Sequence, residues 1–135
     1  MNVHRLESEM LAFEQVNCDL SHHVIGGMYA RSGMIPAGHT LVGATHKTDH
    51  ISVLFGDVSI TTDEGVKRLT GHHVLPTLAG MKRAIYAHAD TLMTTVCKTT
   101  KVEIAEIEDE LVHESDKLQT RNQISWEKNS CSLPA

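Results

Sequence analysis

Residues 38–56 read GHTLVGATHKTDHISVLFG, and this stretch decides which fold the sequence predicts. From residue 50 onward, apolar and polar side chains alternate, which is the period of a β-strand with two different faces. His46, Asp49 and His50 stand at the start of this strand, which is expected to end at Gly56. Histidine and carboxylate side chains at short spacing bind first-row metals or transfer protons near neutral pH. The stretch therefore predicts a polar site mounted on a strand.

The two-residue period extends outward from this stretch over about residues 22–99. It predicts short strands at 23–32, 40–46, 50–55, 58–62, 66–69, 73–76, 83–88 and 91–98. Gly, Pro and Asp residues separate them, and Asp63-Glu64-Gly65 is a strong hairpin signal. Short strands at such regular intervals are typical of a mainly β fold, an antiparallel sandwich or barrel.

Helical periodicity flanks the predicted barrel on both sides. An apolar stripe every three to four residues predicts helices over residues 4–16 and 102–118. The last segment, 119–135, has no period and is expected to be a flexible tail. A chain of 135 residues fits one domain, which we place at residues 1–118.

Charge and composition exclude several classes of partner. The net charge is −5, and four Lys or Arg against eight Asp or Glu follow residue 100. A polymeric nucleic acid or an anionic membrane needs a basic face, so we expect neither as a partner. The three cysteines lie far apart without a CxxC pair, and no signal peptide or membrane-length apolar run is visible. We expect a cytoplasmic protein with reduced thiols.

The order of motifs resembles a known family. Pro36-Ala37-Gly38, the histidine-rich turn, the strand to Gly56, the hairpin signal and Gly80-Met81-Lys82-Arg83 follow one another as in a small single-domain cupin. More narrowly, the chain resembles short cupin-like proteins encoded by bacteriophages, which would place it in a host cytoplasm. The resemblance implies an antiparallel jelly-roll barrel that binds a small molecule. It also implies a homodimer in which the two copies pair through their N-terminal strands. The strand predicted at 23–32 is the candidate for the element that they exchange.

The chain departs from the cupin metal motif at three positions. Ala44 stands where the family has its first histidine, Asp49 stands at the glutamate position, and Arg83 lies near the distant histidine position. Of the family's metal set, only His46 and Asp49 match. The resemblance therefore supports the barrel more strongly than it supports a metal.

A metal site remains one hypothesis for these residues. His46, Asp49 and His50 would hold one divalent ion such as Zn, Fe, Mn or Ni, or the two histidines would act as catalytic acid and base. Strand parity opposes the full set, because Asp49 and His50 cannot both point inward from a regular strand. Either Asp49 points inward with apolar neighbours, or His50 points inward with Ser52, or a turn or bulge at Thr48 brings both inward. The alternative is that these residues are solvated turn residues.

A cluster of basic residues suggests a second site. Arg31, Lys47, Lys82 and Arg83 are expected to gather at the mouth of the barrel, with His88 as a further lining residue. Such a group suits a carboxylate or a phosphate. The alternative is that the cations are surface charges and that His88 is an ordinary sheet histidine.

Three functions therefore remain open from the sequence. The first is an enzyme that acts on a small polar or phosphorylated molecule. The second is a binding protein that sequesters a small anionic ligand such as a nucleotide signal. The third is a structural or interaction module with no ligand.

Overall fold

The computed structural model of the protein describes residues 2–11 and 16–121. Its elements, in chain order, are α1 (Val3–Met10), β1 (Ser21–Ile25), β2 (Met28–Ile35), β3 (Thr40–Val42), β4 (His50–Thr62), β5 (Gly65–Thr77), β6 (Ala84–Ala87), β7 (Thr91–Lys98), α2 (Ile104–Leu111) and the 3₁₀ helix η1 (Ser115–Lys117).

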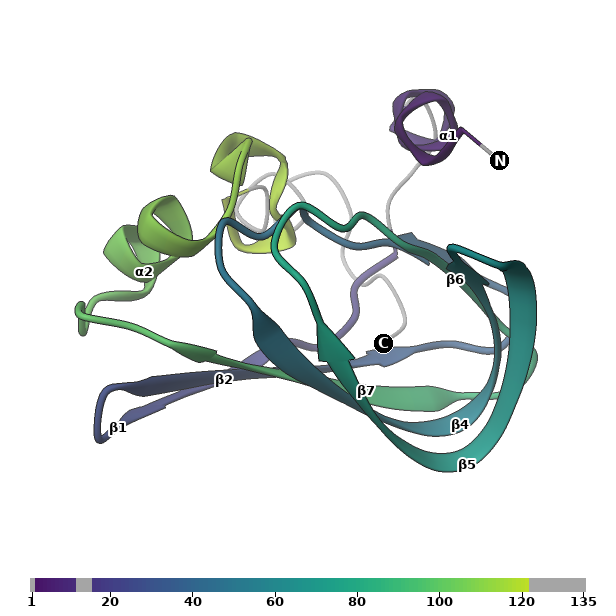
Figure 1. The fold of residues 1–135 in the computed structure, drawn as a ribbon, viewed down its shortest axis with the longest axis horizontal. Coiled ribbons are helices and arrows are strands. Elements are labelled where there is room, and N and C mark those ends of the chain that lie inside the picture. Colours follow the sequence, from purple (N-terminus) through teal and green to yellow (C-terminus); the bar gives the residue numbers. More distant parts are fainter. Residues whose placement is uncertain (1, 12–15, 122–135) are drawn as a thin grey trace.

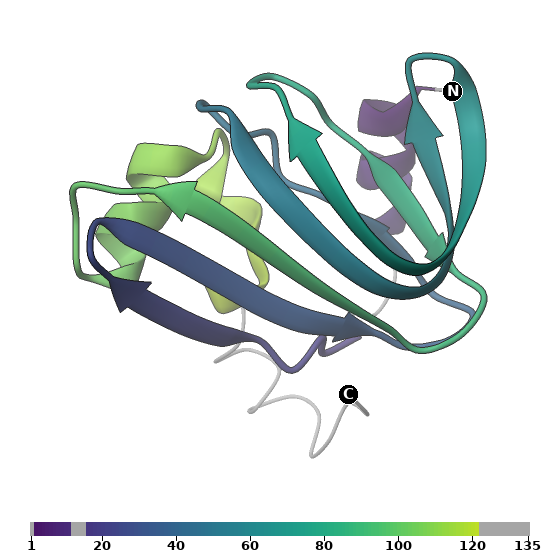
Figure 2. The ribbon, with the colours of Figure 1, turned by 60° about the horizontal axis from the view of Figure 1, so that its bottom comes forward.

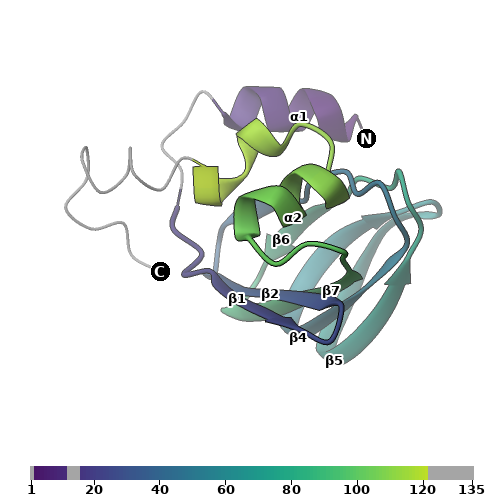
Figure 3. The ribbon, with the colours of Figure 1, turned by 90° about the vertical axis from the view of Figure 1, so that its left-hand side faces the viewer.

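The strands form one curled antiparallel sheet, as predicted. The order is β1-β2-β7-β4-β6-β3, and β5 pairs with the other edge of β4 along its whole length. The sheet curls into a half-barrel, with α1, α2 and η1 all on its concave side (Figures 1 and 3). In residues 2–11 and 16–121, no helix lies on the convex side. No helix in the described part of the chain is long and apolar enough to cross a membrane.

Several predicted strand boundaries were wrong. The predicted strand 23–32 is a hairpin, because Gly26 and Gly27 both have positive φ and turn β1 back onto β2. Residues 50–55 and 58–62 belong to the single strand β4, which does not end at Gly56. A Cβ on Gly56 would lie 2.2 Å from Thr91 Oγ1, so glycine here permits a close approach of two strands.

The adjoining segments differ from the sequence prediction in the same way. Residues 66–69 and 73–76 are both parts of β5, so two mergers and one division turn the eight predicted strands into seven. The predicted strand 40–46 is regular only as β3, after which His46 makes an isolated bridge to Val112. The helix predicted at 102–118 ends at Leu111, because Val112 is extended. Part of the helix predicted at 4–16, and most of the tail, lie outside the described residues.

Alternation along β4 assigns its two faces. Leu54, Val58 and Ile60 are fully buried on the concave side, whereas Ile51 and Phe55 are exposed on the convex side. The concave side holds two groups of buried residues. One comprises Ile35, Leu54, Val58, Ile60, Ile85 and Ala87, and the other comprises Tyr29, Cys97, Ile107, Leu111, Val112 and Leu118. The second group packs α2 against β2 and β7 at one end of the half-barrel.

Candidate functional site

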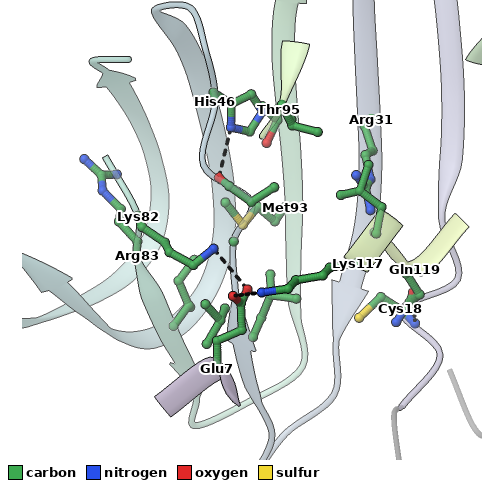
Figure 4. A pocket seen from close by; sticks show the side chains of 18 of the residues that line it. Glu7, Cys18, Arg31, His46, Lys82, Arg83, Met93, Thr95, Lys117 and Gln119 are labelled. Carbon is green, nitrogen blue, oxygen red and sulfur yellow. Dashed lines mark hydrogen bonds and ion pairs between the residues drawn. The ribbon is translucent and has the colours of Figure 1, made fainter. Parts of the chain in front are cut away.

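A cavity of about 790 Å³ lies between the concave face of the sheet and the helices. Its walls come from β2, β3, β7, the strand start at residue 50, the segment 80–85, α1 and the segment 108–119. Most of the lining is apolar, and a few polar and charged groups converge on it (Figure 4). Pockets of this size and character are the usual sites for small molecules.

His46 and His50 both line this cavity. Strand parity is settled by burial, since His50 shares the concave side of β4 with the buried Ser52. The two imidazole rings are stacked, with centroids 3.9 Å apart and planes 30° apart. Burial, and then the neighbouring His50, lower the pKa of His46 to about 4. His46 is therefore neutral at pH 7.

Backbone carbonyls fix the orientation of both rings. His46 Nδ1 lies 3.2 Å from the Ala44 carbonyl oxygen, and His50 Nδ1 lies 3.1 Å from that of Thr48. A carbonyl only accepts hydrogen bonds, so each Nδ1 carries the proton and donates it. In the neutral ring, Nε2 then keeps its lone pair and can accept a hydrogen bond from a ligand.

The described residues do not fit the three-ligand metal site expected from the sequence. Asp49 is exposed, and its Oδ1 accepts a hydrogen bond of 2.8 Å from the Ala79 amide. It therefore closes a turn instead of joining His46 and His50. Across residues 2–11 and 16–121, no group of three or more His, Cys, Asp and Glu side chains is placed to hold an ion. The two imidazoles alone fall short of a protein metal site.

Arg31 is a further cation in the wall of this cavity. It lines the cavity from the inner face of β2, between Tyr29 and Gly33 on the same face. Among the residues that the structure describes, no carboxylate pairs with its guanidinium. Burial raises the pKa of Tyr29 to about 12 and that of Cys97 to about 11, and the positive charge of Arg31 opposes both shifts. Both groups are therefore protonated at neutral pH, and neither supplies a counter-charge.

Lys82 also reaches the cavity, but it is already paired. Its Nζ lies 3.0 Å from Glu7 Oε2, and the two side chains are only 8% and 13% exposed. Lys117 Nζ approaches the other oxygen of Glu7 at 3.6 Å and also pairs with Glu114. Figure 4 shows these contacts converging on Glu7, apart from Arg31. The carboxylate of α1 thus neutralises this end of the cavity.

The remaining three residues of the predicted anion site do not gather with Arg31. Arg83 lines the cavity wall, but its Nε donates to Met81 Sδ at 3.2 Å, and burial lowers the pKa of its guanidinium. Lys47 is exposed and donates to the Asp109 carbonyl oxygen of α2 at 2.9 Å. His88 is exposed on the outside of the sheet, where its Nε2 lies 2.7 Å from Ser59 Oγ.

Several cavity residues were missed by the sequence analysis. Tyr29 was assigned to an exchange strand, yet it points inward and its hydroxyl lies 2.6 Å from His22 Nδ1. The parity of β2 could have shown this, since residues 29 and 31 share one face. Glu7 and Lys117 carry no comparable signal, because only the folded chain brings α1 and η1 to the barrel.

Comparison with known proteins supports the fold. No model of a protein family matches the sequence, and no curated protein matches it. Among solved structures, ectoine synthase from P. lautus matches with a TM-score of 0.54 and 17% identity, over 73% of this chain and 75% of that one. KdgF from Halomonas sp. matches with a TM-score of 0.50 and 13% identity, over 61% and 78%.

A cupin-2 domain containing protein from Shewanella frigidimarina aligns with a TM-score of 0.49 and 10% identity, over 69% of this chain and 91% of that one. Identities this low concern the fold alone and carry no activity across. The single curled antiparallel sheet around a lined cavity is similar in fold to ectoine synthase and KdgF, and it agrees with the mainly β, jelly-roll barrel that the motifs of the sequence predict.

Proposed function

We propose that this protein is a small-molecule-binding cupin whose cavity holds an organic anion on Arg31. The observation that carries the proposal is an arginine inside a largely apolar cavity that no carboxylate of the described residues pairs with, since the nearby Glu108 is paired with Arg121. A guanidinium that is partly removed from water and left unpaired is unfavourable by itself. A ligand carboxylate or phosphate would satisfy it through two parallel hydrogen bonds.

The other lining groups define the rest of the ligand. Ser52, Thr95 and the imidazoles of His46 and His50 offer hydrogen-bonding partners to a ligand in the cavity. Met93 and Ile85 supply apolar contact. Because Glu7 neutralises Lys82, the cavity does not present a broad basic surface. This arrangement favours a molecule with one anionic group and a partly apolar body over a highly charged one.

The test is ligand-induced thermal stabilisation. The purified full-length chain would be screened with aliphatic and aromatic carboxylates, sugar phosphates and nucleoside monophosphates. A ligand at 100 times its Kd stabilises the fold by about 2.7 kcal/mol, which is a clear shift in Tm. We expect a compound from this set to raise Tm, and Arg31→Gln to abolish that rise.

The matched control is Arg68→Gln. Arg68 is an arginine on the outside of the same sheet, paired with Asp57 at 2.8 Å. This variant should keep the full ligand-induced shift. If no compound of the set shifts Tm, or if Arg31→Gln responds as strongly as the native chain, the cavity does not bind anions through Arg31.

A second candidate is an enzyme in which His46 and His50 act on the bound molecule. The observation in its favour is that both rings are held through Nδ1, which leaves Nε2 facing other partners. A general base works best when its pKa lies near the working pH, so His46, with a pKa of about 4, would need a bound anion to raise that pKa. The metal-dependent form of this hypothesis is tested by elemental analysis of untagged protein. Stoichiometric Zn, Fe, Mn or Ni that disappears in His46→Ala and His50→Ala would support it, and metal-free protein would refute it.

Two further predictions from the sequence stay predictions. A cytoplasmic location is supported by the widely spaced cysteines, of which Cys18 and Cys97 are free and buried. Fractionation of cells that express the protein from its native locus would test it. Pairing into a homodimer through residues 23–32 is less well supported, because this segment is a hairpin and its Tyr29 is committed to the interior.

A further inference from the structure

Helix α1 forms one wall of the cavity without belonging to the core. Glu7 and Met10 of α1 and Leu11 at its end line the cavity, yet none of the residues of α1 is fully buried. Helix α2, by contrast, buries three of its residues, among them Ile107 and Leu111. Figure 2 shows the two helices at opposite ends of the concave side of the sheet. One helix is therefore anchored in the core, whereas the other only covers the cavity.

Two ion pairs join α1 to the rest of the chain. Glu7 Oε2 lies 3.0 Å from Lys82 Nζ, and Glu7 Oε1 lies 3.6 Å from Lys117 Nζ. Lys82 precedes β6 and Lys117 belongs to η1, so these contacts connect α1 to two separate segments of the cavity wall. The pair between Arg5 and Glu9, in contrast, stays within the helix and is exposed to solvent. We call Glu7, Lys82 and Lys117 the latch.

A helix held in this way can leave the cavity at a moderate cost in free energy. On release, the carboxylate and the two ammonium groups regain their hydration, which offsets much of the lost attraction. Leu11 is already 46% exposed in the docked position, so undocking exposes little further apolar surface there. Segments with few buried apolar contacts open locally while the core strands keep their structure. We therefore expect α1 to separate from the cavity without unfolding of β4.

We propose that α1 is a lid on the cavity and that the latch holds it closed. When the latch opens, Met10 and Leu11 leave the cavity wall and a small molecule can enter. When it closes, Glu7 returns to the two lysines. Figure 4 shows the latch apart from Arg31. The lid controls access whatever the cavity binds, so this inference goes beyond anion binding by Arg31 and does not depend on it.

Two cysteines of the native chain report access to the cavity. Cys18 and Cys97 both line it, and they are only 9% and 3% exposed. Burial raises the pKa of both thiols, so each is shielded and protonated in the closed state and should react slowly. The probe is iodoacetamide, from which a thiolate sulfur displaces iodide to form a thioether. Cys18, Cys97 and Cys131 fall on separate tryptic peptides, so mass spectrometry gives the alkylation rate of each.

Access should not require unfolding of the chain. In urea below the unfolding transition, the alkylation rate of Cys18 and Cys97 should stay nearly constant, because the opening of a lid exposes little surface. Amide exchange in β4, which reports unfolding of the sheet, should accelerate steeply over the same range. If alkylation rises with urea as steeply as exchange in β4, the thiols react in the unfolded chain and the proposal is overturned.

Breaking the latch should accelerate the reaction. Glu7→Gln should raise the alkylation rate of both thiols by more than about tenfold, because it leaves Lys82 buried without the charge of Glu7. Lys82→Gln breaks the latch from the other side and should act in the same way. The double variant should react no faster than the faster single variant, since both changes remove the same interaction.

The matched control is Glu9→Gln, which removes the same charge from the same helix. Glu9 pairs with Arg5 at the exposed surface, so this variant should react like the native chain. Equal alkylation rates in Glu7→Gln, Glu9→Gln and the native chain overturn the proposal, because Glu7 then holds no lid. The measurement uses no ligand, so its outcome is separate from the question of whether Arg31 binds an anion.

Discussion

Arg31 and Lys82 are two cations in the wall of one cavity, and they differ in what the fold places beside them. Lys82 meets Glu7 of α1 at 3.0 Å, with both side chains almost fully buried. Arg31 meets no carboxylate in the described part of the chain, and its near neighbours Tyr29 and Cys97 stay protonated. One cation therefore serves the structure, and the other is available to a ligand.

This difference teaches that basic residues cannot be counted toward a binding site until their partners are known. All four cations of the predicted anion site have the residue type that such a site requires. The fold pairs Lys82 with an acid, turns Lys47 onto a backbone carbonyl and packs Arg83 against a sulfur atom. The following predictions test whether the remaining contrast between Arg31 and Lys82 is real.

The largest effect is expected from Lys82→Met, which removes one partner of a buried pair. Glu7 would keep only the longer contact to Lys117. Breaking a buried ion pair in this way costs about 3 kcal/mol of the free energy of unfolding. Urea denaturation measures that loss, and amide exchange should show reduced protection of α1.

The control for this change is Lys67→Met, since Lys67 pairs with Glu64 at 2.8 Å on the surface. An exposed pair contributes little, so this variant should resemble the native chain. If Lys82→Met is as stable as Lys67→Met, the ion pair with Glu7 does not stabilise the fold. Lys82 is then again a candidate for a cation that binds the ligand.

A smaller effect is expected from His46, which lines the same cavity as Arg31. It concerns the pH dependence of the free energy of unfolding. Burial lowers the pKa of His46 to about 4, while the unfolded chain takes up the proton at the ordinary value of 6.5. Below pH 6.5 the unfolded state binds more protons, so this contribution to stability falls as the pH drops toward 4. Between pH 7 and pH 5 the loss amounts to about 2 kcal/mol.

Replacing His46 by Gln should remove this part of the pH dependence. Urea denaturation of both proteins at pH 7 and pH 5 gives the difference directly, because all other titrating groups are shared. Equal losses in the native chain and in His46→Gln would mean that His46 is hydrated and takes up protons freely in the folded state.

The smallest effect on stability is expected from Arg31→Met. No ion pair with a described residue is lost, and a partly buried cation is exchanged for an apolar side chain of similar length. The free energy of unfolding should change by less than about 1 kcal/mol, with either sign. A loss as large as that of Lys82→Met would show that Arg31 has a structural partner, and the contrast would disappear.

Much of the fold was predictable because alternation is a local property. The pattern around Ile51, Val53 and Phe55 predicted an antiparallel strand whether these side chains faced in or out. The strand ends were less predictable. Gly56 is typical of a turn, yet it lies inside β4, because its missing side chain lets Thr91 approach. That reason involves a residue far away in the sequence.

The candidate site was predictable only in part. His46 and His50 do line the cavity, and so do three of the five residues predicted to bind a ligand: Arg31, Lys82 and Arg83. Asp49 faces the solvent, because residue 50 points inward and its neighbour must point the other way. From the alternation of the sequence alone, either Asp49 or His50 could point inward. The burial of Ser52 and Leu54, which share a face of β4 with His50, shows that His50 does.

By itself, the sequence determined that this protein folds as an antiparallel sandwich or barrel with polar residues at the start of its central strand. Periodicity and turn residues are sufficient for that, since they act over a few neighbouring positions. The tertiary structure alone decided that Glu7 neutralises Lys82 and that Arg31 has no acidic partner among the described residues. These properties depend on which distant segments meet, and charge or hydrophobicity along the chain does not specify such meetings.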